Sequence, residues 1–211
     1  MNTQRTYFIF IILQEFGMAL TYTSYVPYLR TLGLGPSDVS AVNIGFWIAL
    51  LGFELPTGVF ADRFGRARSV QAGVSILAIS ALLYATATGF ITAMLYEMMF
   101  GIGLSWNREA HTRSTEETRK VYLQTVARGA QYRSLASLIG GLTGGAVGMV
   151  NERFTWLGAG CVLLLATIHA FKYMKDGLCQ TSPRSDANEK GPLRKSWELV
   201  QTRHDLRWVI L

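Results

Sequence analysis

The sequence predicts an all-α membrane protein with six transmembrane helices, and three observations lead to this fold class. Half of the 211 residues are hydrophobic and only 16% are charged, against roughly 25% in an average soluble domain. Residues 69–96 contain no Asp, Glu, Lys or Arg, and this run is longer than the ~20 residues that cross a bilayer core. The charged residues gather instead between long apolar segments, as in multi-pass membrane proteins.

Six apolar segments follow one another along the chain. They are residues 7–29, 40–61, 70–90, 91–107, 134–151 and 154–171. At about 1.5 Å per residue each can cross a bilayer as a helix. The segments lack the alternation of polar and apolar residues that barrel strands show, so we expect helices. The third and fourth segments adjoin, which predicts a tight turn at residues 85–90.

The basic residues predict how these segments are oriented. With a cytoplasmic N-terminus, every Lys and Arg except Arg30 and Arg153 falls on the cytoplasmic side of the membrane. The positive-inside rule favours this orientation, so we expect a cytoplasmic membrane protein with both termini in the cytoplasm. The same rule accounts for the net charge of +6 without a nucleic-acid partner.

The composition divides the chain into a six-span bundle at residues 1–172, a polar region at residues 173–205 and an apolar end at residues 206–211. The polar region predicts a cytoplasmic loop with an amphipathic segment. The chain ends in Arg-Trp-Val-Ile-Leu, an order typical of a helix that enters the membrane from its interface. We therefore expect a seventh segment to begin here, in a protein longer than this chain.

The end of the second segment carries the motif Gly58-Val-Phe-Ala-Asp62-Arg63-Phe-Gly65-Arg66. Gly58 allows another helix to approach closely, and Gly65 permits a tight reversal. Asp62 falls at the negative end of a helix, where a carboxylate needs a cationic partner such as Arg66. This motif, between the second and third segments, resembles the cytoplasmic loop signature of the major facilitator superfamily.

The resemblance implies the N-terminal six-helix half of a twelve-helix secondary transporter. It also implies that Asp62 and Arg66 form a latch at the cytoplasmic face, with a partner helix in the missing half. The alternative for Arg63, Arg66 and Arg68 is a role as topological anchors only.

The fifth segment carries a glycine stripe, formed by Gly140, Gly141, Gly144, Gly145 and Gly148. A spacing of four residues places small residues on one helix face, which favours close contact with another helix. The stripe resembles the glycine-rich fifth helix of proton-coupled antiporters of the superfamily, although it lacks their proline. We interpret it as a helix-packing face; a role in setting the direction of transport is the alternative.

Three carboxylates, Glu15, Glu54 and Glu97, fall inside the apolar segments. A charge at the centre of a bilayer costs roughly 2.5–3.5 kcal/mol on insertion scales, and such residues usually face a bundle interior or a water-filled cavity. Glu15 is the first candidate for proton or cation coupling, whereas Glu54 also fits a snorkelling position near the cytoplasmic end. Four further residues complete the predicted cavity faces: Gln14, Thr21, Tyr25 and Asn43.

The sequence thus predicts half of a carrier that moves a small solute by alternating access, driven by an ion or proton gradient. No Walker pattern occurs, and no residue cluster indicates an enzyme, a cofactor or a metal site. The expected partners are the lipid bilayer, a small-molecule substrate, and the missing C-terminal half or a second copy of the chain. The alternative is a non-transporting membrane scaffold, the remnant of a truncated carrier gene.

Overall fold

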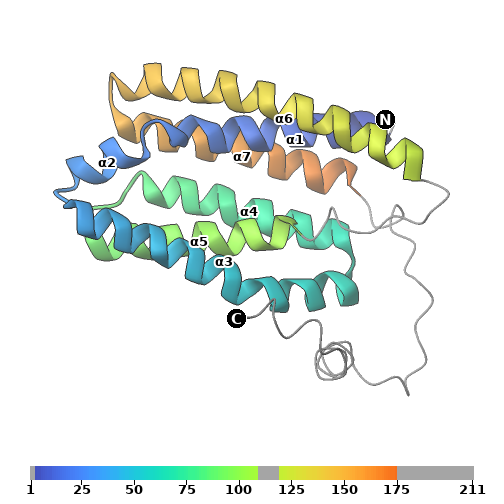
Figure 1. The fold of residues 1–211 in the computed structure, drawn as a ribbon, viewed down its shortest axis with the longest axis horizontal. Helices are drawn as coiled ribbons and strands as arrows, with labels where there is room; N and C mark the ends of the chain where they lie inside the picture. The colour runs from blue at the N-terminus through green and yellow to red at the C-terminus, as the bar shows by residue number, and fades with distance from the viewer. Residues whose placement is uncertain (1–2, 109–118, 175–211) are drawn as a thin grey trace, which may run out of the picture. The chain divides into compact units, whose positions relative to one another are not determined.

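The computed structural model describes residues 3–108 and 119–174. Within these residues the chain is all-helical, with seven helices and no strands (Figure 1), which confirms the predicted all-α class. The helices are α1 (Thr3–Tyr22), α2 (Tyr25–Thr31), α3 (Pro36–Phe64), α4 (Arg66–Tyr84), α5 (Phe90–Arg108), α6 (Arg119–Gly148) and α7 (Glu152–Tyr173). Residues 175–211, with most of the predicted cytoplasmic loop and the start of a seventh segment, lie outside the described residues.

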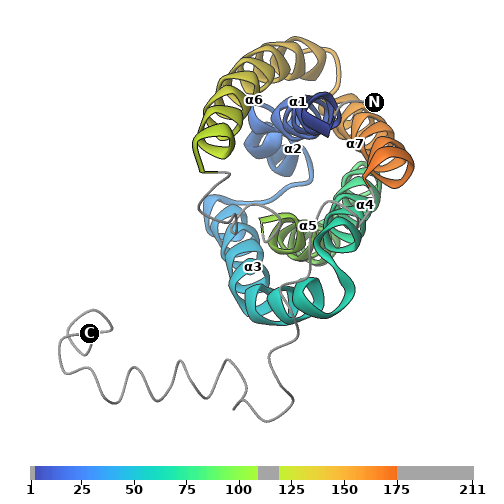
Figure 2. The same cartoon turned by 90° about the vertical axis from the view of Figure 1, so that its right-hand side faces the viewer.

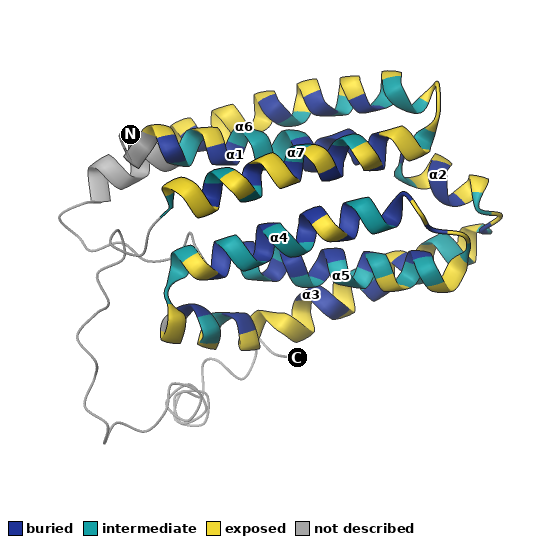
Figure 3. Cartoon of the chain, turned by 180° about the vertical axis from the view of Figure 1, so that it is seen from behind, coloured by how far each residue is buried: buried dark blue, intermediate teal, exposed yellow. Residues whose placement is uncertain are grey.

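Several helices have the length and composition of membrane spans. In the described part of the chain these are residues Pro36–Ala61 of α3, the whole of α4 and the whole of α7. The bent pair of α1 and α2 makes a fourth if it counts as one span. Exposed positions lie along the outside of the helices (Figure 3). They include large apolar side chains, such as Leu51 at 61% and Leu142 at 69% exposed. These features indicate a membrane protein, because hydrocarbon rather than water suits such a surface.

The helices pack in pairs that follow a repeated scheme. The extensive contacts are those of α1 with α6 and α7, of α5 with α3 and α4, and of α4 with α7 (Figure 2). Exchanging α1 with α5, α3 with α6 and α4 with α7 reproduces the same set of contacts. The described residues therefore form two three-helix units with the same pattern of neighbours. One unit contains α1, α6 and α7, and the other contains α5, α3 and α4.

Glycines set the closest approaches in both units. A Cβ atom on Gly144 of α6 would overlap the backbone of Leu20 in α1. In the equivalent pair, a Cβ atom on Gly101 of α5 would lie 2.6 Å from the carbonyl oxygen of Phe46 in α3. Side chains cannot approach backbone so closely, so both helix pairs depend on glycine at the contact.

The predicted first segment, residues 7–29, is broken. α1 and α2 meet at an angle of 47°. Pro27 lies in the first turn of α2 and has no N–H to donate to the carbonyl of Thr23, four residues earlier. The hydroxyls of Ser24 and Thr155 lie 2.7 Å apart and share a hydrogen bond that ties the break to α7. A continuous helix through this region was therefore the wrong expectation.

The boundary between the third and fourth predicted segments also shifts. α4 ends at Tyr84 instead of residue 90, and α5 begins at Phe90, which confirms the turn predicted at residues 85–90. Thr92 Oγ1 accepts hydrogen bonds from the amides of Thr88 and Gly89, at 3.0 and 3.2 Å. These bonds satisfy amides that the start of α5 would otherwise leave free.

The fifth predicted segment, residues 134–151, is the second part of a much longer helix. α6 begins at Arg119, so Arg128 and Arg133 lie within a helix and not in a loop. Arg, Lys and Gln favour helices about as well as Leu does. An apolar segment therefore marks where a helix can enter lipid, and not where the helix begins.

Candidate functional site

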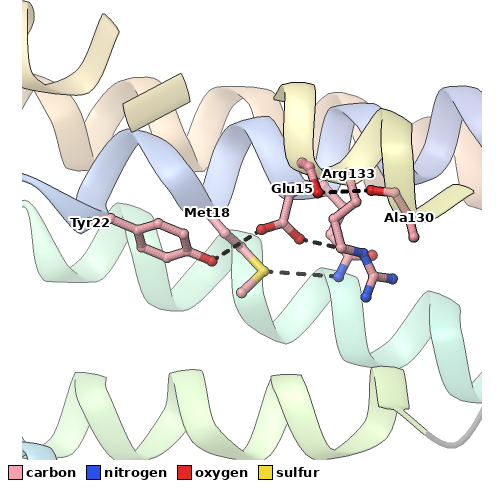
Figure 4. Close-up of polar contacts among 7 residues, drawn as sticks. Glu15, Met18, Tyr22, Ala130 and Arg133 are labelled. Carbon is pink, nitrogen blue, oxygen red and sulfur yellow. Dashed lines mark hydrogen bonds and ion pairs between the residues drawn. The ribbon is translucent and has the colours of Figure 1, made fainter. Parts of the chain in front are cut away.

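An ion pair between α1 and α6 forms the first candidate site (Figure 4). Arg133 Nε lies 3.7 Å from Glu15 Oε2, and the Tyr22 hydroxyl donates a hydrogen bond to Glu15 Oε1 at 3.3 Å. The Glu15 side chain is 17% exposed and that of Arg133 is 50% exposed. Each carboxylate oxygen thus has a partner, while half of the arginine surface remains accessible.

Helix periodicity and the glycine stripe bring these groups together. Glu15 and Tyr22 are seven residues apart, which places them on the same face of α1. Arg133 and Gly140 have the same spacing in α6, and a Cβ atom on Gly140 would lie 2.8 Å from the Cβ atom of Ala19. The close contact at the glycine therefore holds the arginine two turns away beside α1.

The other predicted polar residues of α1 have mainly local bonds. Gln14 is half-buried, and its Nε2 atom lies 3.9 Å from Met18 Sδ in a weak hydrogen bond. The Thr21 hydroxyl is buried and donates to the Met18 carbonyl at 2.8 Å. Gln14 thus lies beside the ion pair, whereas the hydroxyl of Thr21 is used within its own helix.

A second acidic group, Glu97, lies on α5 among aromatic side chains. It is 7% exposed, and it interacts electrostatically with the hydroxyls of Tyr84 on α4 and Tyr25 on α2. The ring of Tyr84 stacks on Trp156 of α7, with centroids 3.9 Å apart and an interplanar angle of 10°. Four buried atoms of this cluster lack a hydrogen-bond partner among the described residues: Glu97 Oε2, Tyr25 OH, Tyr84 OH and Trp156 Nε1.

The two remaining predicted polar residues lie on α3. Asn43 is exposed, and its side chain interacts with the hydroxyl of Tyr25. The structure therefore places Asn43 and Tyr25, both predicted to line a cavity, near Glu97. Glu54 is exposed on the same helix and belongs to neither acidic site as the described residues define them.

The glycine-containing motif forms the turn between α3 and α4. Gly65 separates the two helices with a φ of 98°, a backbone conformation that favours glycine. Its amide donates to the carbonyl of Ala61 at 3.0 Å, which closes the last turn of α3. The guanidinium of Arg63 lies 5.4 Å from the centre of the Phe64 ring. Residue 65 is thus the point at which the chain reverses.

The latch predicted from this motif involves side chains that are only partly described. Gly58 is half-buried within α3, and Arg66 is half-buried at the start of α4. The side chain of Asp62 lies outside the described residues. The pairing of Asp62 with Arg66 stays a prediction.

The glycine stripe divides into a contact face and an open position. Gly140 and Gly144 meet α1, and a Cβ atom on Gly148 would lie 3.3 Å from Ser24 Cβ. A Cβ atom on Gly145 would lie 3.5 Å from Thr23 Oγ1, an ordinary contact distance, and one on Gly141 would have no neighbour within 4 Å. The face that includes Gly140 and Gly144 packs against α1, as a stripe of small residues allows.

Sequence reasoning missed Arg133, Tyr22, Tyr84 and Trp156. Arg133 could have been found from its spacing to the glycine stripe, whereas no pattern in the sequence links Tyr84 with Trp156. Among the described residues there is no group of three or more His, Cys, Asp or Glu that could hold a metal ion. The chain matches no protein-family model and no curated protein.

Proposed function

We propose that this chain is the N-terminal half of a secondary transporter of the major facilitator superfamily. Six membrane-crossing segments form the half: α1 with α2, then α3, α4, α5, α6 and α7. The observation that carries the proposal is the ion pair that joins Glu15, in the largely apolar helix α1, to Arg133 at the start of the apolar part of α6. Charged residues inside membrane segments usually line a substrate or ion pathway.

The contact scheme of the helices supports the same proposal. The two three-helix units have equivalent neighbours, as in transporters whose halves contain inverted repeats. Helices that are related by such a repeat can exchange roles when a binding site opens to one side of the membrane and then to the other. The turn at Gly65 would lie on the cytoplasmic side, with Asp62 and Arg66 as its latch.

The ion pair indicates which kind of solute the proposed pathway would bind. Arg133 contacts Glu15 through Nε and is half exposed, so the outer edge of its planar guanidinium is available to a polar solute. Two parallel N–H groups of arginine match a carboxylate or another flat acceptor. We infer a small solute with such a group, bound between this half and its C-terminal partner or a second copy of the chain, within the cytoplasmic membrane.

Cysteine accessibility tests this function. After both native cysteines are replaced by Ser, Gln14→Cys should react with a membrane-impermeant maleimide from both sides of the membrane, because alternating access opens the site each way. Leu138→Cys is the matched control, since Leu138 is 61% exposed on an apolar surface that we assign to lipid.

The reaction also separates the transporter from the alternative of a non-transporting scaffold. A scaffold has no pathway through the bilayer, so Gln14→Cys would react from one side at most. Reaction of Gln14→Cys from one side only, or from neither side, while Leu138→Cys does not react, would refute the transport role.

A further inference from the structure

Glu97 has an environment unlike that of Glu15. Its carboxyl group is buried on α5, and within the described residues no Lys, Arg or His forms an ion pair with it. An isolated carboxylate in an apolar interior is strongly unfavourable. The group is stable there only with a positive charge bound to it.

The groups that face Glu97 are hydroxyls and rings. Tyr84 from α4 and Tyr25 from α2 are the titratable groups in electrostatic contact with it, and Tyr96 lies beside it on its own helix. A tyrosine hydroxyl can donate to a carboxylate and can accept from a carboxylic acid. The same two side chains therefore suit Glu97 with and without a proton.

Trp156 indicates which positive charge the site takes. Its indole Nε1 is one of the buried atoms without a partner, and an indole nitrogen is a donor only. A metal cation would need several oxygen ligands around it, and the indole of Trp156, which stacks on Tyr84, provides none. A proton needs no ligand shell.

A polar route leads from the surface to the cluster. Asn43 is exposed on α3 and interacts with Tyr25, and Tyr25 in turn interacts with Glu97. Each step joins groups that can both donate and accept hydrogen bonds. Asn43 and Tyr25 thus place polar groups between the surface and Glu97, while the Tyr25 hydroxyl and Glu97 Oε2 keep free hydrogen-bonding capacity among the described residues.

We propose that Glu97 is the residue that binds the coupling proton. The inference rests on the proposed transport function. A proton from bulk water adds to Oε2 of the Glu97 carboxylate to form the neutral acid, and it leaves to water when the site opens to the other side. No other bond forms or breaks, and Tyr25 and Tyr84 act as positioning residues.

Infrared difference spectroscopy of the purified 211-residue chain in lipid nanodiscs tests the proposal without a transport assay. A change of pH should produce a C=O stretching band of a protonated carboxyl group, which shifts in D2O. Glu97→Gln should abolish the band, and Glu15→Gln should leave it in place. Loss of the band in Glu15→Gln and its persistence in Glu97→Gln would overturn the proposal.

A third variant and a sodium titration complete the experiment. Tyr84→Phe keeps the stacked ring and removes one hydroxyl, so the band should remain with a shifted pH midpoint, even if Glu97→Gln fails to fold. An unshifted midpoint in this variant would contradict the proposed cluster. A midpoint that moves with Na+ concentration at constant ionic strength would instead assign the site to sodium.

The spectroscopic result and the cysteine reaction fail independently. A titrating band that depends on Glu97, combined with one-sided reaction of Gln14→Cys, would refute the transporter and keep the proton site. Two-sided reaction without the band would refute the proton site alone.

Discussion

Glu15 and Glu97 are both carboxylates in apolar helices, yet the fold treats them in opposite ways. Glu15 lies at the contact of α1 and α6, with an arginine on one oxygen and a tyrosine hydroxyl on the other. Glu97 lies in the other three-helix unit, deeper in the bundle, with an oxygen that has no hydrogen-bond partner. The first group is compensated by charge and the second is surrounded by aromatic rings.

The difference shows that the hydropathy of a segment says little about the state of an acid within it. What matters is the neighbouring helix. A glycine face lets α6 approach α1 and supplies a cation, whereas α4 and α7 supply Tyr84 and Trp156 to the surroundings of Glu97. The following substitutions break or sharpen this comparison.

The largest effect on stability should come from separating α1 and α6, the helices that carry Glu15 and Arg133. In Gly144→Ala the new Cβ atom meets the Leu20 backbone, which cannot move as a side chain does. We therefore expect the free energy of unfolding to fall by about 1–3 kcal/mol. Thermal unfolding in detergent measures it. Gly141→Ala is the matched control, since that Cβ atom has no neighbour within 4 Å, and equal losses in both variants would contradict this packing.

The next largest effect should follow from removing the cation. Arg133→Met leaves Glu15 without its charged partner, and a buried group left unsatisfied costs about 1–3 kcal/mol. We expect the lower end, because Arg133 is 50% exposed. Arg128→Met, an exposed position in the same helix, should change the unfolding temperature little. The double variant with Glu15→Gln should regain part of the loss; no recovery would argue against the pair.

Neutralising Glu15 should lower the stability of the protein, whereas neutralising Glu97 should leave the stability nearly unchanged or raise it. Glu15→Gln removes a charge that Arg133 compensates, so the unfolding temperature should fall. Glu97→Gln keeps the volume and imitates the protonated acid that we propose for Glu97, so stability should stay within about 1 kcal/mol of the parent or rise. Unfolding of both variants at neutral pH measures the difference. A large fall for Glu97→Gln alone would reverse the comparison.

The smallest effect should come from the hydroxyl on Glu15. Tyr22→Phe deletes one hydrogen bond of 3.3 Å, and such a bond contributes about 0.5–1.5 kcal/mol. Tyr22 is 52% exposed, so we expect the lower end of this range in the same unfolding assay. Tyr132→Phe, which keeps its ring beside Phe8, serves as control, and a greater loss there would contradict the assignment.

Much of the helical pattern could be predicted, because apolar segments of sufficient length have few other stable forms. The bend at Thr23 was missed although Pro27 signals it, since the segment looked continuous in hydropathy. The start of α6 was missed for the opposite reason: its first turns are polar, and hydropathy reports lipid contact and not helix formation.

The candidate sites were less predictable than the helices. Glu15 and Glu97 stood out because acids are rare in such segments, but their partners lie on helices far away in sequence. Arg133 was placed in a loop, and Tyr84 and Trp156 carried no visible signal. A pair that depends on how two helices cross cannot be obtained from the periodicity of either one.

The length of α6 has a mechanical consequence. Its 30 residues form a rod of about 45 Å at 1.5 Å per residue, against roughly 30 Å of hydrocarbon. In the proposed membrane position several turns of α6 would project beyond the lipid or the helix would tilt, and proline, the usual cause of a sharp kink, does not occur between its ends. A force on the projecting end of α6 would therefore rotate the helix about its contact with α1 at Gly140 and Gly144, and Arg133 would move with the projecting part.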